Sequence, residues 1–361
     1  MKISKKIKVL IIDDSLLFRE MISRGISEDD CIEVVGTAAD PYIARDKIIE
    51  LEPDVLTLDV EMPKMNGIEF LKKLMPQYPI PVVVVSSIST NVFDALKSGA
   101  VDFVTKPDAT NPMALKMFIN ELIINIKIAS IAKVGHLKSN FTPETTQSKT
   151  TTNSILSADG RMLKSGSLDS NLIIAIGAST GGTEAIFDVI KAFPREMPGI
   201  VVVQHMPPVF TRIYAERLNN SCRLEVKEAQ NGDLVKPGRV LIAAGDFHMK
   251  LIKEGSQYYV KCFSGEKVNR HCPSVDVLFD SVAATAPRNS IGIILTGMGN
   301  DGAKGLLNMR KSGAYTFGQD EKSSIVYGMP MVAFNIGAVS KQLPLSDIPA
   351  AVIDNINSRV K

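Results

Sequence analysis

One serine of this chain lies in a glycine-rich turn that directly follows a short apolar run. The run Leu172–Ile176 ends in Gly-Ala-Ser-Thr-Gly-Gly and leads straight into a helix-like pattern. The turn spells G-x-S-x-G from Gly177 to Gly181, which places the serine hydroxyl at the end of a strand and beside the N–H groups of a helix N-terminus. Ser179 is therefore a candidate nucleophile.

A serine hydroxyl is a poor nucleophile at neutral pH, so it needs a general base and an acid that orients the base. His205 fits the base best, because it follows the apolar run Gly199–Val203 at the carboxyl end of another expected strand. The other histidines lie in a polar segment, after a loop and before a helix, and fit less well; they are His136, His248 and His271.

Asp301 is the candidate for the orienting acid. It lies in Thr296-Gly-Met-Gly-Asn-Asp-Gly302, which follows the run Ile291–Leu295, and such a loop can also present a backbone N–H to an oxyanion. The order Ser, His, Asp along the chain differs from the Ser, Asp, His order of α/β-hydrolases. The G-x-S-x-G spelling therefore does not indicate membership of that fold.

The loop around Asp301 has a second interpretation. Gly297-x-Gly299-x-x-Gly302 matches the dinucleotide-binding spelling, and Asp320 lies near the expected distance downstream. However, Asp301 would then place a carboxylate beside the pyrophosphate, and the loop comes late in its domain rather than in the first βαβ unit. A dinucleotide site would also leave the serine and the histidine unexplained, so we favour the triad.

The first third of the chain carries a second set of reactive side chains. They end or follow successive apolar runs and are Asp13, Asp14, Asp59, Ser86 and Lys106. The carboxyl ends of parallel strands meet at one edge of a sheet, where three carboxylates repel one another unless a hard cation such as Mg²⁺ binds them. Bound Mg²⁺ would leave one carboxylate able to attack a phosphoryl group. For Asp13 and Asp14 alone, capping of the next helix is the simpler alternative.

Alternating strand-like and helix-like runs must position these residues, and they predict an α/β fold in both halves of the chain. In the first half, five apolar strands with intervening helices predict a parallel sheet that is covered on both faces. The expected strands are Lys8–Asp13, Glu33–Ala38, Val55–Asp59, Pro81–Ser86 and Asp102–Thr105. The expected helices are Leu16–Ser27, Tyr42–Leu51, Gly67–Met75, Asn91–Ser98 and a long final stretch from Met113 to about Ser130.

The second half repeats this pattern and adds an antiparallel hairpin. The hairpin pairs Met249–Ile252 with Tyr258–Phe263 through a turn at Glu254-Gly255-Ser256. The main strands are expected at Leu172–Ile176, Gly199–Val203, Val240–Ala243, Ile291–Leu295 and Ala314–Phe317, and the helical patterns follow Gly182, Pro208, Val275 and Gly302. We therefore expect a doubly wound α/β domain with an antiparallel hairpin.

A polar segment separates the two halves. Residues 129–170 lose hydrophobic periodicity and include a stretch of almost entirely small and polar residues, which cannot bury enough apolar surface to offset the entropy of ordering it. We therefore divide the chain into a domain at 1–128, a flexible linker at 129–170 and a domain at 171–361.

Composition excludes some locations and partners. The first apolar run breaks at Asp13-Asp14, too early for a signal peptide or a membrane span. The four cysteines have no disulfide spacing, which indicates a reducing, cytoplasmic compartment, and the trio Cys262, His271 and Cys272 lacks a second ligand pair with zinc spacing. A net charge of +2 argues neither for nor against nucleic acid as a partner. No helix-turn-helix pattern or basic face follows the linker, which disfavours a DNA-binding regulator.

Residues 6–127 closely resemble the response-regulator receiver domain, which has a flavodoxin-like five-stranded sheet. The resemblance rests on the strand-end residues above together with Met62-Pro-Lys-Met-Asn-Gly67 and Asp102-Phe-Val-Thr-Lys-Pro107. It implies that Asp59 accepts the phosphoryl group, that Asp13 and Asp14 together with Asp59 bind Mg²⁺, and that Ser86 and Lys106 form the phosphorylation switch. It also implies a chemotaxis sensor histidine kinase as phosphodonor.

Residues 171–356 resemble the chemotaxis-specific protein-glutamate methylesterases, the CheB family. The motifs are Ile-Gly-Ala-Ser-Thr-Gly-Gly-Thr-Glu-Ala, Gln-His-Met-Pro-Pro, Pro-Ser-Val-Asp-Val-Leu-Phe and Leu-Thr-Gly-Met-Gly-Asn-Asp-Gly. The resemblance implies Ser179, His205 and Asp301 as the triad. It also implies that Thr180 and the backbone of Met298 are active-site neighbours and oxyanion donors. Cys272 departs from the family, which usually has arginine before Pro-Ser-Val-Asp.

The resemblance implies a phosphorylation-gated serine esterase. Its substrates would be glutamate methyl esters, and certain glutamines, on methyl-accepting chemotaxis receptors, and its esterase domain would need no cofactor. A catalytically idle docking adaptor is the remaining alternative from another class. We expect neither a nucleic-acid partner nor insertion into a membrane.

Overall fold

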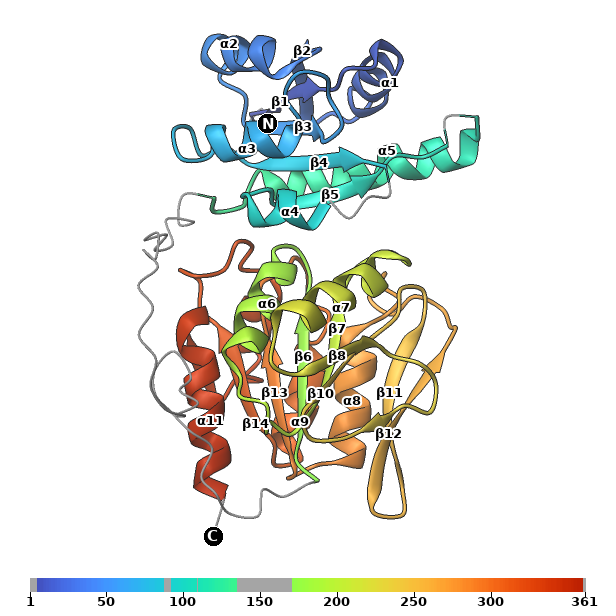
Figure 1. Ribbon diagram of the computed structural model, residues 1–361, viewed down its shortest axis with the longest axis vertical. Coiled ribbons are helices and arrows are strands. Elements are labelled where there is room, and N and C mark those ends of the chain that lie inside the picture. Colours follow the sequence, from blue (N-terminus) through green and yellow to red (C-terminus); the bar gives the residue numbers. More distant parts are fainter. Residues whose placement is uncertain (1–4, 88–91, 109, 135–170, 360–361) are drawn as a thin grey trace, which may run out of the picture. The chain divides into compact units, whose positions relative to one another are not determined.

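The computed structural model describes residues 5–87, 92–108, 110–134 and 171–359. The chain divides into two compact units, Met1–Asn140 and Phe141–Lys361 (Figure 1). Most of the predicted linker at 129–170 lies outside the described residues, so its flexibility stays a prediction. Within the described residues, no helix is both long and apolar enough to cross a membrane.

The first unit contains a parallel sheet of five strands in the order β2-β1-β3-β4-β5. The strands are β1 (Ile7–Ile12), β2 (Ile32–Ala38), β3 (Val55–Asp59), β4 (Val82–Ser86) and β5 (Asp102–Thr105). Strands β3 and β4 are buried along their whole length, as expected for central strands with helices on both faces. All five predicted strands of this half are confirmed.

Helices alternate with these strands, also as predicted. They are α1 (Leu16–Ile26), α2 (Pro41–Leu51), α3 (Gly67–Leu74), α4 (Val92–Lys97) and α5 (Pro112–Ala129). Polar side chains accept hydrogen bonds from the first free N–H groups of four of these helices, at Ser15, Asp40, Asn66 and Asn111. The N-cap of α1 is thus Ser15, not Asp13 or Asp14, and Asp13 Oδ1 accepts a hydrogen bond from the N–H of Ser15 at 2.8 Å.

The second unit contains a parallel sheet of seven strands in the order β15-β14-β13-β6-β7-β10-β8. These strands are β6 (Ile173–Ala178), β7 (Gly199–Gln204), β8 (Glu225–Glu228), β10 (Arg239–Ile242), β13 (Ser290–Ile294), β14 (Tyr315–Gln319) and β15 (Lys341–Leu343). The chain starts at β6, builds the sheet outward through β7, and later returns to place β13 on the other side of β6. The strand order therefore reverses next to β6, and sites of open α/β sheets form outside the carboxyl ends of strands at such a point.

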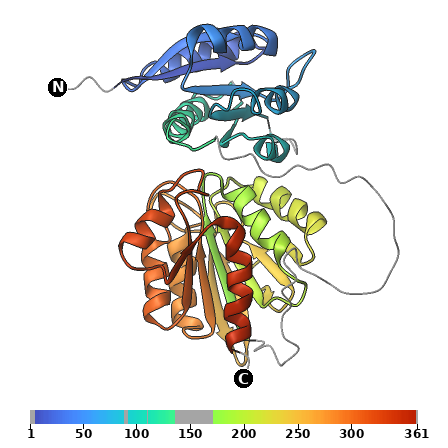
Figure 2. The same cartoon turned by 90° about the vertical axis from the view of Figure 1, so that its left-hand side faces the viewer.

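Helices cover both faces of this sheet (Figure 2). They are α6 (Gly182–Ala192), α7 (Phe210–Ser221), α8 (Val275–Thr285), α9 (Ala303–Lys311), α10 (Met329–Asn335) and α11 (Ile348–Arg359). Helices α8 and α9 pack against each other and against the central strands, while α6 packs against α7 and α11. The core contains the fully buried β6, β7 and β13, which hold the loops after them in fixed positions.

The predicted hairpin is confirmed and is longer than expected. It pairs β11 (His248–Glu254) with β12 (Gln257–Phe263), and Gly255 adopts a φ of 60° in the connecting turn. A short strand, β9 (Leu234–Val235), completes this antiparallel sheet. Sequence reasoning missed β8, β9 and β15, because strands of two to four residues at sheet edges carry almost no periodic signal.

Candidate active site

Ser179 and His205 are neighbours because their strands are neighbours in register. Strand β6 pairs with β7 up to Ala178 opposite Gln204, and the serine and histidine are the next residues of each strand. The N–H of His205 donates to Ala178 O at 3.2 Å, and the Gln204 amide donates to Ser179 O at 2.9 Å. The structure thus brings these two predicted residues to one edge of the sheet.

Glycine residues allow the neighbouring backbone to pack closely around Ser179. Gly181 has a φ of 75° and is the N-cap residue of α6, and the N–H of Gly182 donates to Ser179 O at 2.7 Å. The loop after β13 then passes so close that a Cβ on Gly297 would lie 2.7 Å from Ser179 Cβ. Only glycine allows this approach, which packs the Thr296–Gly302 loop against the nucleophile candidate.

The two expected oxyanion neighbours differ in exposure. Thr180 is buried, and its carbonyl accepts a hydrogen bond from Thr296 Oγ1 at 3.0 Å. Met298 is 42% exposed and directly follows Gly297, the residue that touches Ser179. Both residues therefore lie at the serine, although only Met298 has a side chain that reaches solvent.

His205 and Asp301 form a hydrogen-bonded pair. His205 Nε2 lies 2.8 Å from Asp301 Oδ2, and both side chains are buried. Burial alone raises the pKa of Asp301, but the hydrogen bond and charge of His205, with further donors from Asn269 and Ser274, hold that pKa well below its usual range. Asp301 is thus an ionised acceptor for the imidazole at neutral pH.

Backbone donors fix Asp301 further. The first turn of α8 contributes the N–H of Val275 to Oδ2 at 2.7 Å and the N–H of Asp276 to Oδ1 at 3.2 Å. The Ser274 hydroxyl donates to Oδ1 at 2.7 Å. The N-terminus of α8 therefore binds this carboxylate, as helix N-termini bind anions generally.

The other ring nitrogen of His205, Nδ1, is buried and makes no hydrogen bond within the described residues. Because Nε2 contacts Asp301, Nδ1 is the ring nitrogen that makes no contact with this carboxylate. One imidazole nitrogen of His205 is therefore bound to Asp301, and the other is free to exchange a proton.

A second histidine lies against the first. The ring of His271 stacks on that of His205 with centroids 3.6 Å apart. Burial, and next the neighbouring His205, lower the pKa of His271 to about 4. Sequence reasoning ranked His271 behind His205, because no spacing within the sequence shows that this loop returns to the sheet edge.

The first unit brings its predicted acidic residues together as well. Asp13, Asp14 and Asp59 each offer a carboxylate oxygen, and these oxygens all lie within 4.8 Å of one another. Burial raises the pKa of Asp59, with Lys106 opposing and Asp13 reinforcing that shift. Such a set of hard oxygen donors fits a divalent cation.

Lys106 and Ser86 lie at the same edge. Lys106 Nζ lies 2.6 Å from Asp59 Oδ2 and 2.8 Å from Asp13 Oδ2. Burial lowers the pKa of the lysine, but its hydrogen bonds to the two carboxylates outweigh burial and raise it. The Ser86 hydroxyl is buried and has no hydrogen-bond partner within the described residues.

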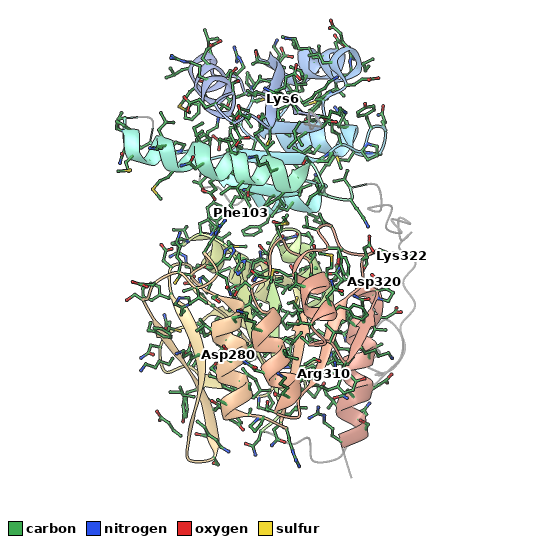
Figure 3. The ribbon with its side chains drawn as sticks, turned by 180° about the vertical axis from the view of Figure 1, so that it is seen from behind. Lys6, Phe103, Asp280, Arg310, Asp320 and Lys322 are labelled. Carbon is green, nitrogen blue, oxygen red and sulfur yellow. The ribbon has the colours of Figure 1, made fainter. Side chains whose placement is uncertain are left out.

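The residues of the dinucleotide interpretation have other partners. Asp301 is held by the network described above, and Asp320 Oδ1 accepts hydrogen bonds from the N–H and hydroxyl of Ser323 in the loop after β14 (Figure 3). Asp320 therefore stabilises a local turn.

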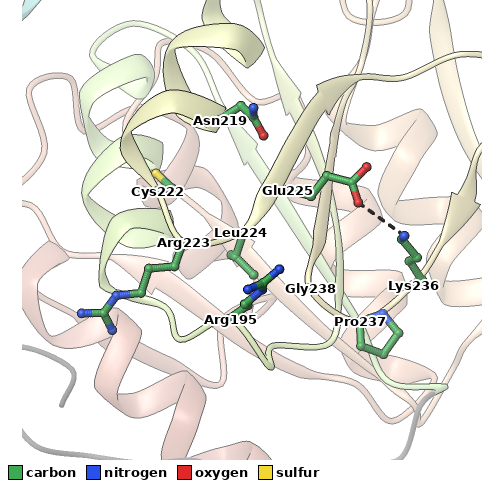
Figure 4. Close-up of a pocket in the computed structure, with 9 residues that line it drawn as sticks. All are labelled: Arg195, Asn219, Cys222, Arg223, Leu224, Glu225, Lys236, Pro237 and Gly238. Atoms are coloured by element: carbon green, nitrogen blue, oxygen red, sulfur yellow. Dashed lines mark ion pairs between the residues drawn. The ribbon is translucent and has the colours of Figure 1, made fainter. Parts of the chain in front are cut away.

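The second unit also has a polar cavity of about 420 Å³. Figure 4 shows residues that line it. Its lining residues lie before β7, from the end of α7 to the first residue of β8, and before β10. They include the ion pair of Glu225 with Lys236 at 3.4 Å. Because parallel strands all point the same way, residues that precede β8 and β10 lie at the end of the sheet away from Ser179. This cavity is therefore separate from Ser179, His205 and Asp301.

Two protein families match the two units of the chain. The CheB methylesterase family matches residues 174–352, and the response regulator receiver domain matches residues 9–117. A protein-glutamate methylesterase/protein-glutamine glutaminase 2 of Syntrophomonas wolfei is 56% identical over 355 residues, which cover 98% of each chain. Its counterpart from Salmonella typhi is 46% identical over 358 residues, again 98% of each chain.

A solved structure covers the second unit. The CheB methylesterase catalytic domain of Thermotoga maritima is 38% identical, with a TM-score of 0.50, and the match covers 51% of this chain and 98% of that one. The similarity to the two relatives spans both units. The chain therefore belongs to the CheB methylesterase family, with a receiver domain ahead of the catalytic domain.

Proposed function

We propose that the chain is a phosphorylation-regulated protein-glutamate methylesterase that acts on methyl-accepting chemotaxis receptors in chemotactic adaptation. The observation that supports this most is the buried His205–Asp301 pair at the sheet edge next to Ser179. The relatives named above are protein-glutamate methylesterases and protein-glutamine glutaminases, which supplies the class of substrate.

Ser179 attacks the carbonyl carbon of the glutamyl methyl ester, and His205 accepts the hydroxyl proton through Nδ1. Asp301 holds the imidazole through Nε2 and stabilises the imidazolium that forms. The oxyanion is stabilised by backbone N–H groups near Thr180 and Met298.

The imidazolium then protonates the methoxy group, and methanol leaves an acyl-enzyme at Ser179. His205 next takes a proton from water, whose oxygen attacks the acyl carbon. Collapse of the second tetrahedral intermediate returns the proton to Ser179 and releases the glutamate. A glutamine side chain follows the same route with ammonia as leaving group, because amide and ester pass through similar intermediates.

In the receiver domain, Asp59 is the phosphoacceptor and Lys106 binds an oxygen of the phosphoryl group. Ser86 moves its buried hydroxyl onto the phosphorylated aspartate and so changes the surface of the domain. Asp13, Asp14 and Asp59 would hold Mg²⁺, which neutralises charge on the incoming phosphoryl group. A chemotaxis sensor histidine kinase supplies that group.

Gating couples the two domains. In the proposed mechanism, the unphosphorylated receiver covers the serine cleft and phosphorylation biases the enzyme toward an open state. The linker at 129–170 keeps the receiver at a high effective concentration in both states.

The deciding experiment measures methanol release from membranes that contain methylated receptors, with and without a small-molecule phosphodonor and Mg²⁺. Ser179→Ala should abolish release, and the wild-type enzyme should be stimulated by the phosphodonor. Release by Ser179→Ala near the wild-type rate would reject the proposed nucleophile. An active enzyme without stimulation would reject gating alone.

A further inference from the structure

A tight turn between β12 and α8 contacts the acid of the triad. Val268 and His271 exchange backbone hydrogen bonds at 3.0 and 2.9 Å, and the two residues between them, Asn269 and Arg270, have φ values of 50° and 72°. Two consecutive positive φ values are typical of a type I′ turn, which glycine and asparagine favour. Arginine is rare there, so the surrounding structure holds this turn in place.

The side chain of Asn269 joins two buried carboxylates. Its Nδ2 lies 2.8 Å from Asp301 Oδ1 and 2.8 Å from Asp276 Oδ2. Asp301 is 1% exposed and Asp276 is 6% exposed, so water supplies little screening between them. A primary amide carries two N–H donors, and each is directed at one carboxylate here.

The two carboxylates would otherwise compete for a proton. Burial raises the pKa of Asp276, a backbone hydrogen bond from Gly305 lowers it, and the charge of Asp301 raises it again. Two like charges in a buried site disfavour double ionisation. Removal of the amide leaves Asp276 and Asp301 without the donor that they share, and a proton taken up by the pair weakens the acceptor of His205.

We propose that Asn269 is a positioning residue of the active site, whose amide separates Asp276 from Asp301 and keeps Asp301 oriented toward His205. Asn269 does not touch the ester and acts only through Asp301. The assignment rests on the proposed function, since it gives Asp301 the role of orienting the catalytic base.

Backbone conformation allows the amide to be removed without disturbing the turn. Glycine adopts a positive φ freely, so Asn269→Gly deletes the amide and preserves the turn. Arg270→Gly is the matched control, because it makes the same backbone change one residue later and leaves the amide in place. Asn269→Asp keeps the shape of the side chain but replaces two donors with a third carboxylate.

The measurement is methanol release by the full-length protein, with kcat and KM determined between pH 5.5 and 8.5 in the presence of phosphodonor. We expect kcat of Asn269→Gly to fall about 10- to 100-fold with KM changed less than about twofold, as for a misplaced catalytic group. The kcat of Asn269→Asp should fall at least as far, and the kcat of Arg270→Gly should stay within about threefold of the wild-type value.

The pH profile separates a positioning role from a purely structural one. Asp301 and Asp276 face each other, and each faces one further titratable group: His205 for Asp301 and Asp280 for Asp276. Besides burial, the charges of Lys267 and Arg270 lower the pKa of the neighbouring His271. Asn269→Gly alters none of these groups. That variant should therefore gain an additional acid-side ionisation from the carboxylate pair, and Arg270→Gly should not. Replacing Asp276 as well, in Asn269→Gly/Asp276→Asn, should restore part of kcat and remove this ionisation.

Equal kcat values for Asn269→Gly and Arg270→Gly, or an unchanged pH profile in Asn269→Gly, would overturn the proposal. A wild-type enzyme that releases no methanol would instead reject the proposed function. In that case the rate at which a serine-directed ester probe labels Ser179 still tests this inference. Labelling requires only acylation, and it should be slower in Asn269→Gly than in Arg270→Gly.

Discussion

The imidazole rings of His205 and His271 lie face to face, with their centroids 3.6 Å apart and their planes inclined by 7°. Burial and the neighbouring His205 lower the pKa of His271 to about 4, so this ring is neutral at pH 7. In the proposed mechanism, a neutral His271 ring packs against His205 without repelling the imidazolium that forms there. The pair therefore restricts the plane of His205 at no electrostatic cost in the neutral range.

His271 should make the stability of the catalytic domain depend on pH. Its proton binds near pH 4 in the folded chain and near 6.5 in the unfolded chain, so the unfolded chain binds more protons between these values. Stability therefore falls as the pH falls through this window, by about 2 kcal/mol at pH 5 from ~1.4 kcal/mol per pKa unit. Denaturant unfolding of the full-length protein at pH 7 and pH 5 measures this loss in the transition of the catalytic domain.

His271→Phe is the matched variant for that experiment, because it keeps a flat ring but cannot titrate. Between pH 7 and pH 5, we expect His271→Phe to lose less stability than the wild type, and the difference should be most of the about 2 kcal/mol given above. Equal losses in the two proteins would show that His271 titrates normally in the folded state.

Asp301→Asn should reduce kcat for methanol release by about 10³- to 10⁴-fold, because the amide cannot stabilise the imidazolium and favours the wrong tautomer of His205. KM should change little, since Asp301 does not contact substrate. Asp320→Asn is a suitable control, because the Asp320 carboxylate accepts hydrogen bonds from the N–H and hydroxyl of Ser323 in its own turn. A comparable loss in both variants would indicate a general defect of folding.

Gly297→Ala should lower both stability and activity. The added Cβ would lie 2.4 Å from Met329 Sδ and 2.7 Å from Ser179 Cβ, so the loop or the serine must shift. Overpacking of this kind costs about 1–3 kcal/mol. Thermal unfolding and methanol release can be compared with Gly255→Ala, a change in the open hairpin turn that should reduce stability through its positive φ but leave kcat unchanged. Wild-type kcat in Gly297→Ala would contradict the close packing.

Asp59→Asn should abolish stimulation by a phosphodonor while basal methanol release remains. The raised pKa of Asp59 also predicts that phosphorylation slows as the pH falls through that pKa, because only the ionised carboxylate attacks.

Ser86→Ala should still be phosphorylated, but its methanol release should be stimulated less by the phosphodonor. Chelation of divalent cations should block phosphorylation. Phosphorylation of Asp59→Asn at the wild-type level would place the acceptor elsewhere.

Much of this architecture could be predicted from local sequence. The buried strands β1, β3, β4, β6, β7 and β13 are continuous apolar runs, and glycine-rich or acidic loops directly follow several of them. Because the carboxyl ends of parallel strands share one edge, the positions of Ser179, His205 and Asp301 in the chain were sufficient to expect them together. The same reasoning applied to Asp13, Asp59 and Lys106.

Tertiary structure alone decided the contacts that come from outside the sheet. Asn269 and His271 belong to a turn after the hairpin, where neither periodicity nor a motif indicates that the chain returns to the triad. The same holds for the edge strands β8 and β15, whose few residues pair only because the rest of the sheet is already formed. Local sequence determines which backbone conformations are favourable, whereas the environment of a buried carboxylate or imidazole depends on long-range packing, which fixes the partners and the pKa of each group.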